Sequence, residues 1–183
     1  MMSHPVDRLV SQFFDCLTDH DTHHGLSKWC DENEDDEPLM NRLVQFAVVN
    51  WRNYALNMIG VTCTPQQECA PEQVNPSFNL ASTEGRNRLE MAKRKLSTYD
   101  AVGIIDHWDL SMKLYDAKVT SPVWSWSDIT YPVNAGTQSL KREELLYWAR
   151  ENHVIRYIVE GDLLLYEHGL SLFKQQTMES LGT

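Results

Sequence analysis

Apolar residues recur at helical spacing along most of the chain, and one short run breaks that pattern. Residues 101–105 (Ala-Val-Gly-Ile-Ile) are apolar without interruption, as in a strand that is buried on both faces. Amphipathic helices are expected on either side, over residues 84–99 and 107–115. Their apolar positions are Leu89, Ala92, Leu96 and Tyr99 in the first, and Leu110, Met112 and Leu114 in the second. Helix, strand and helix in this order predict one layer of an α/β domain.

Four further helices are expected from the same periodicity. They cover residues 5–17, 38–59, 139–151 and 155–176. Ser139 can cap the third of them, because a serine hydroxyl accepts from the free N–H groups of a helix start. The tail after Gln176 is polar and is expected to fray.

The length and the net charge of the chain limit its domain number and its main binding partners. With 183 residues, 1–183 is expected to form a single domain with its own core. The net charge of −10 argues against nucleic acid and anionic membranes as main partners. No apolar run is long enough to span a membrane, and the first residues lack the pattern of a signal peptide.

A histidine-rich stretch is a candidate metal site. His20, His23 and His24 have helical ligand spacing, with Cys30 nearby. The alternative is a polar helix end that runs into a loop, and this interpretation is favoured because short motifs of this kind often mislead. The acidic run at 31–37 lacks the glycine of a calcium-binding loop and is expected to be a solvated loop.

Two other features each have a functional and a structural interpretation, and a third, Asp106, has a structural one only. Trp124 and Trp126 can form a platform for a sugar ring, or can plug the edge of the core. Asp106 follows the expected strand and can cap the next helix. One helix carries a basic group that can meet a sulfated glycan, although a solvated helix face is favoured. The residues of this group are Arg86, Arg88, Lys93, Arg94 and Lys95.

Three motifs occur in an order that resembles a known family. The first is His-Pro-Val-Asp-Arg-Leu-Val-Ser-Gln-Phe at residues 4–13. The second, at 89–106, is Leu-x-x-Ala-Lys-x-x-Leu-x-x-Tyr-x-x-Val-Gly-Ile-Ile-Asp, and the third, at 162–167, is Asp-Leu-Leu-Leu-Tyr-Glu. Together they resemble the carbohydrate sulfotransferases of the secretory pathway, especially the 2-O-sulfotransferases that act on uronic acid in glycosaminoglycans. The resemblance covers most of residues 3–175.

The resemblance implies a fold, an activity and a location. The fold would be a P-loop-like α/β sulfotransferase fold that is partial and helix-rich and lacks the first β-α-β portion. The activity would be transfer of a sulfuryl group from 3′-phosphoadenylyl sulfate (PAPS) to a carbohydrate hydroxyl, without a metal. A glycosaminoglycan is the implied acceptor, and the Golgi is the implied location. Since no strong strand follows residues 101–105, the missing sheet neighbours are expected from an upstream segment.

The first motif implies a binding site for the 3′-phosphate of the donor. The family pattern is Arg-x-Pro-x-x-Arg-x-x-Ser, and here Ser3 stands at the first Arg, Arg8 at the second and Ser11 at the Ser. Arg8 and Ser11 are therefore the predicted cofactor-binding residues. The structural alternative places both on a helix surface, with Arg8 stabilising the turn.

No catalytic residue is assigned. The sequence has no Gly-rich donor loop of the GxxxxGK type, and none of its seven histidines follows a strand that resembles the family's, as a catalytic base would. The isolated chain is therefore expected to be an inactive, N-terminally truncated or degenerate sulfotransferase. One alternative is a non-catalytic remnant that binds a glycan or a protein partner. A second is a helical scaffold whose match is accidental.

Cysteine usage bears on the location. The resembled enzymes often carry a close cysteine pair, and Cys63 and Cys69 enclose five residues. If the chain is secretory, these two are expected to form a disulfide. If the chain is cytosolic, both are expected to be free thiols.

Overall fold

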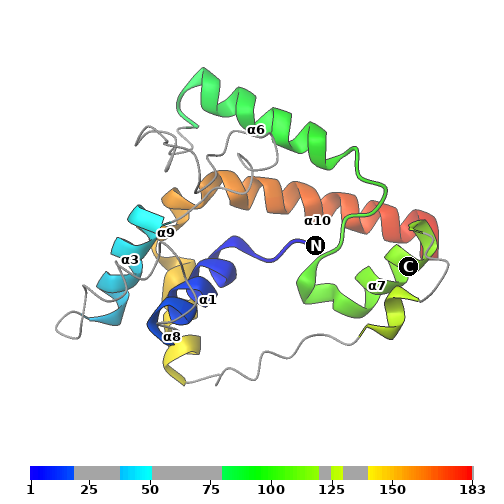
Figure 1. Ribbon diagram of the computed structural model, residues 1–183. Helices are drawn as coiled ribbons and strands as arrows, with labels where there is room; N and C mark the ends of the chain where they lie inside the picture. Colours follow the sequence, from blue (N-terminus) through cyan, green and yellow to red (C-terminus); the bar gives the residue numbers. More distant parts are fainter. Residues whose placement is uncertain (19–37, 51–79, 120–124, 130–139, 183) are drawn as a thin grey trace, which may run out of the picture.

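The computed structural model describes residues 1–18, 38–50, 80–119, 125–129 and 140–182 (Figure 1). In these ranges the chain forms seven α-helices, two short 3-10 helices and no β-strand. The α-helices are α1 (Pro5–Thr18), α3 (Leu39–Asn50), α6 (Thr83–Leu96), α7 (Trp108–Lys118), α8 (Leu140–Glu151), α9 (His153–Ile158) and α10 (Glu160–Leu181). The 3-10 helices are η1 (Ile105–His107) and η2 (Trp126–Asp128). The prediction of a P-loop-like α/β fold is therefore wrong for the described part of the chain.

The helix predictions are largely confirmed. In α1, apolar residues at helical spacing are fully buried, namely Val6, Leu9, Val10 and Phe13. The helix α6 starts where Ser82 Oγ accepts from the N–H of Gly85 at 2.9 Å, and it buries Leu89, Ala92 and Leu96 as expected. Tyr99 lies beyond the end of α6 and is exposed.

Two hydrophobic regions hold the helices together. The first joins α1, α3, α8 and α9 around buried side chains that include Phe13, Leu43, Phe46, Leu145 and Ile155. The second consists of two clusters around α10, one against α6 and one against α7, and the half-buried Met2 packs against both clusters. Figure 1 shows α10 running across the molecule, with the first group of helices near its start and α7 near its end. α10 is therefore the element that links the two regions.

Residues 102–104 are buried, as predicted, whereas Ala101 and Ile105 at the ends of the run are half-buried. Among the described residues, the only β-bridge of this run is with Met2. Met2 N–H donates to Gly103 C=O, and Ile105 N–H donates to Met2 C=O, both at 2.8 Å. These bonds form a single parallel bridge between Met2 and Ile104. A sheet would require further backbone neighbours along this segment.

Side chains occupy the opposite edge of this segment. Ser111 Oγ on α7 accepts from Ile104 N–H and donates to Ile104 C=O, both at 2.9 Å. Gln176 Oε1 on α10 accepts from Val102 N–H at 2.9 Å. Buried backbone groups must be paired, and here helix side chains pair them in place of another strand. This is the physical reason why a strand-like sequence forms no strand.

The final helix also differs from expectation. Instead of one helix, α9 and α10 meet at Val159, whose φ of −98° and ψ of 8° interrupt the helical path. The predicted fraying after Gln176 is wrong, because Thr177 is 3% exposed and α10 continues until Gly182, where φ is 70°. A left-handed glycine is a common way to end a helix.

Two expectations extend beyond the described residues: helix 38–59 after residue 50, and the Ser139 cap. Among the described helices, none combines the length and the apolar character needed to cross a membrane.

Candidate functional site

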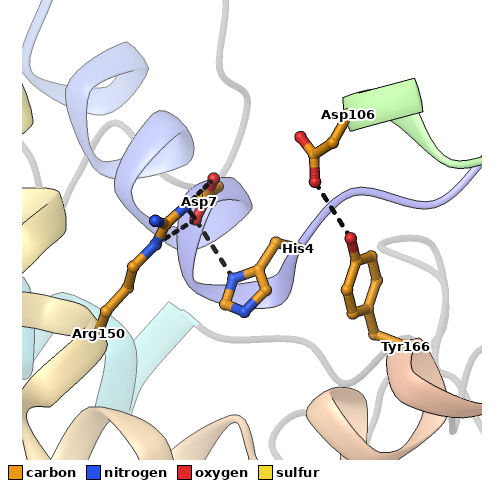
Figure 2. A network of polar contacts seen from close by, with 5 residues as sticks. All are labelled: His4, Asp7, Asp106, Arg150 and Tyr166. Carbon is orange, nitrogen blue, oxygen red and sulfur yellow. Dashed lines mark hydrogen bonds and ion pairs between the residues drawn. The ribbon is translucent and has the colours of Figure 1, made fainter. Parts of the chain in front are cut away.

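Ionisable side chains from four elements meet beside the start of α1 (Figure 2). They are His4 and Asp7 at α1, Asp106 on η1, Arg150 on α8 and Tyr166 on α10. We call these five residues the α1 cluster. It brings together side chains from distant parts of the described chain.

Arg150 fixes the carboxylate of Asp7 through both oxygens. Arg150 Nη2 donates to Oδ1 at 2.8 Å and to Oδ2 at 2.7 Å, and Nε donates to Oδ1 at 3.1 Å. His4 Nδ1 lies 3.2 Å from Asp7 Oδ1. At this distance the two side chains form an ion pair when the imidazole is protonated. Burial alone would raise the pKa of Asp7, but the contacts with His4 and Arg150 outweigh burial and hold it below its ordinary value.

Tyr166 connects the start of α10 to η1. Its hydroxyl donates to Asp106 Oδ2 at 3.1 Å, and its ring meets the His4 ring edge-on with centroids 5.3 Å apart. Burial first, and then the charge of Asp106, raise the pKa of Tyr166 to about 12. Asp106 therefore accepts from Tyr166 rather than capping α7, and the N-cap residue of α7, His107, makes no side-chain capping bond. The capping prediction for Asp106 is wrong.

Arg8 is committed to an internal partner. Its Nη2 donates to Asp162 Oδ2 at 3.2 Å, and the two side chains are only 14% and 2% exposed. A buried charge is costly unless it is paired, so each group stabilises the ionised form of the other. This contact joins α1 to the first turn of α10, so Arg8 has a structural role but does not lie at the helix-surface position that the structural alternative gave it.

Ser11 lies one turn further along the same helix, at the interface with α8. Its hydroxyl accepts from Arg142 Nη2 at 3.0 Å, and the guanidinium of Arg142 lies 6.0 Å from the ring centroid of Phe14. Sequence reasoning missed Arg142, because 131 residues separate it from Ser11 and no local motif marks it. The structure thus supplies a hydroxyl and a guanidinium side by side.

Contacts within and next to α6 favour the solvated-face interpretation of its basic residues. Arg88 pairs with Glu84, and Lys93 Nζ lies 3.0 Å from Glu90 Oε1. Arg86 donates to the backbone carbonyls of Leu80 and Ala81 at 2.9 and 2.8 Å. Exposed pairs of this kind contribute little to stability.

Trp126 is held against α7. Its ring meets that of Tyr115 edge-on at 5.5 Å. The carboxylate of Asp116 accepts from the Ser125 hydroxyl at 2.6 Å and from the Ser127 N–H at 3.0 Å. The hydrogen bonds from Ser125 and Ser127 lower the pKa of Asp116 to about 2. These contacts favour the structural interpretation of Trp126, while Trp124 lies outside the described residues.

The metal and disulfide candidates lie outside the described residues, namely His20, His23, His24, Cys30, residues 31–37, Cys63 and Cys69. Within the described part, no three histidine, cysteine or acidic side chains are grouped so that they could hold a metal ion. Cys16 is buried in the hydrophobic cluster of α1, α3, α8 and α9 and is disulfide-bonded.

The three motifs of the sulfotransferase resemblance meet around the α1 cluster. The first and third motifs contact each other through the Arg8–Asp162 ion pair, and the second and third through the Tyr166–Asp106 hydrogen bond. Met2, directly before the first motif, forms the backbone bridge to the second. Comparison of the chain with protein-family models, curated proteins and solved structures gave no match.

Proposed function

We propose that this chain is a sulfotransferase-like protein that binds the 3′-phosphate end of PAPS or of its product PAP, and that the chain alone does not transfer the sulfuryl group. The resembled enzymes use a carbohydrate hydroxyl as acceptor, so a glycan such as a glycosaminoglycan is the proposed acceptor class. A Golgi location belongs to the same proposal.

The convergence of the three motifs is the observation that supports this proposal. Arg8 and Asp162 are separated by 154 positions, and Tyr166 and Asp106 by 60, yet each pair is in hydrogen-bond contact. The three motifs thus lie together in the fold, as the parts of one binding site would. The spatial grouping therefore adds to the evidence from their order along the chain.

The proposed phosphate contacts are Ser11 and Arg142. A hydroxyl donor and a guanidinium suit a 3′-phosphate, because the planar N–H fork of arginine matches the phosphate oxygens. Arg142 Nη2 already lies 3.0 Å from Ser11 Oγ, so the two groups can bind one anion together. Arg142 would then supply the charge that the family pattern assigns to the position of Ser3.

The proposed lack of catalysis follows from the sequence. Sulfuryl transfer needs donors for the developing charge and a base for the acceptor hydroxyl, and these supply most of the rate. The family's Gly-rich donor loop has no counterpart among the eight glycines.

A second candidate is a non-catalytic protein that binds a glycan or a protein partner. It is favoured by the internal contacts of Arg8 and Ser11, since residues of a donor site are here used to join helices.

Calorimetric titration with PAP tests the proposal. We expect PAP to bind and adenosine 5′-phosphate, which lacks the 3′-phosphate, to bind at least about tenfold more weakly, since a charge-assisted contact is lost. Ser11→Ala should weaken PAP binding, whereas Gln12→Ala, an exposed neighbour on α1, should not. Equal affinity for both nucleotides, or no affinity for PAP, would refute donor binding and leave the second candidate.

A separate assay tests the lack of catalysis. The purified chain is incubated with labelled PAPS and uronate-containing glycans, and no labelled glycan is expected. Product above background that disappears in the Ser11→Ala variant would contradict this part of the proposal.

A further inference from the structure

We infer that Asp162 competes with the 3′-phosphate of the donor for Arg8, so that the resting chain carries an internal carboxylate in place of part of the ligand. This inference rests on the proposed function, and it concerns the regulation of the same site.

The contact that carries the inference is a buried one between two elements. Arg8 Nη2 lies 3.2 Å from Asp162 Oδ2, and the side chain of Asp162 is 2% exposed. A carboxylate and a phosphate present similar oxygens to a guanidinium, and each can satisfy it. Asp162 therefore occupies Arg8 in the manner expected of an anionic ligand.

The position of Arg8 on α1 brings it next to the proposed phosphate contacts. Arg8 and Ser11 are three residues apart on one helix, so their side chains are neighbours on its surface. Ser11 in turn contacts Arg142. A phosphate held by Ser11 and Arg142 is thus adjacent to a guanidinium whose charge is already compensated.

Competition of this kind lowers the affinity for the donor. When only a fraction of the protein is in its binding-competent state, the apparent affinity for the ligand is reduced by that fraction. The competent state here is the one in which Arg8 leaves Asp162 and turns to the phosphate. Removing the charge of Asp162 should populate that state and tighten binding.

The first test is the affinity of Asp162→Asn for PAP, measured by calorimetry on the full chain. We expect binding tighter by about tenfold, the equivalent of one charge-assisted hydrogen bond. Glu160→Gln is the matched control, because it removes an exposed acidic side chain from the same first turn of α10. The control should leave the affinity within about twofold, as expected of a screened surface charge. Equal gains in both variants would overturn the inference, since a general loss of negative charge would then explain them.

The second test asks whether the gain passes through Arg8. Arg8→Gln in the Asp162→Asn background should abolish the gain, and a gain that persists would overturn the inference. Because loss of a buried partner can unfold a chain, the side-chain Nε–H resonance of Arg8 is also followed by NMR in the unmodified protein. PAP should shift this resonance, and an unchanged resonance at saturating PAP would overturn the inference.

Failure of the proposed function has a different signature. In that case PAP binds neither the unmodified chain nor any variant. PAP binding that is equal in the unmodified chain and in folded Asp162→Asn would reject only the role of Asp162.

Discussion

Ser111 pairs both backbone groups of Ile104 through a single hydroxyl. The hydroxyl oxygen accepts from Ile104 N–H and its hydrogen is donated to Ile104 C=O, each at 2.9 Å. Both residues are fully buried. A side chain on a helix thereby performs the pairing that a neighbouring strand would perform.

Ser111→Ala should destabilise the fold strongly, although it removes only one hydroxyl group. It leaves a buried N–H and a buried C=O without this partner, and each unpaired group costs about 1–3 kcal/mol. We expect a loss of about 2–4 kcal/mol in the free energy of unfolding, measured by urea denaturation. Ser171→Ala is the matched control, because that exposed hydroxyl only donates to Glu167 C=O, at 3.0 Å. Similar losses in the two variants would contradict the assignment.

Gly103→Ala should introduce a steric clash at the same segment. A β-carbon at this position would lie 2.5 Å from Tyr115 Oη and 2.9 Å from its Cζ. Overpacking of this kind typically costs about 1–3 kcal/mol, and we expect a loss of that size in thermal or urea unfolding. Tyr115→Phe removes the nearer atom only, so the double variant should recover part of the loss. An unchanged stability of Gly103→Ala would refute this packing.

The free energy of unfolding should depend on pH through Asp7. Its pKa in the folded chain lies below the ordinary value of 3.8, so its contribution is present above pH 3.8 and is lost as the pH falls through the lower folded-state pKa. Asp7→Asn should therefore be less stable than the unmodified chain near neutral pH, and the difference should shrink in strong acid. Asp109→Asn, an exposed acidic residue on α7, is the control. A difference between Asp7→Asn and the unmodified chain that is constant with pH would contradict the assignment.

Oxidised protein should contain Cys16 in a disulfide. Mass spectrometry of the alkylated, non-reduced chain should find its peptide linked to another cysteine peptide. Reduction should lower the free energy of unfolding by about 2–4 kcal/mol, as is typical for a native disulfide. A freely alkylated Cys16 in oxidised material would refute the bond. The same experiment tests the Cys63–Cys69 disulfide, which is expected if the chain is secretory.

The sequence predicts the helices better than it predicts the architecture. Apolar spacing locates α1, α6 and α7 because burial on one helix face is a local property. Burial is correctly predicted for residues 102–104 of the apolar run. The hydrogen-bond partners of the run are Met2, Ser111 and Gln176, from three separate parts of the chain. Local hydrophobicity reports burial and does not report which groups pair the backbone.

The candidate site is predicted only in part, for the same reason. The motif that resembles the sulfotransferase pattern contains Arg8 and Ser11, and both lie on α1 as expected for a helix beginning at Pro5. Their partners Asp162 and Arg142 come from α10 and α8. A single sequence carries no signal for such distant contacts, so the ion pair that compensates Arg8 emerges only from the fold.

The place of α10 in the chain has a consequence for biosynthesis. α10 packs against α1, α6, α7 and α9, all of which precede it in sequence. A ribosome that makes this chain from its N-terminus therefore produces every one of these helices before their common partner exists. The apolar faces of α6 and α7 remain uncovered until α10 emerges, which is the period when a nascent chain is most prone to aggregate and most in need of a chaperone.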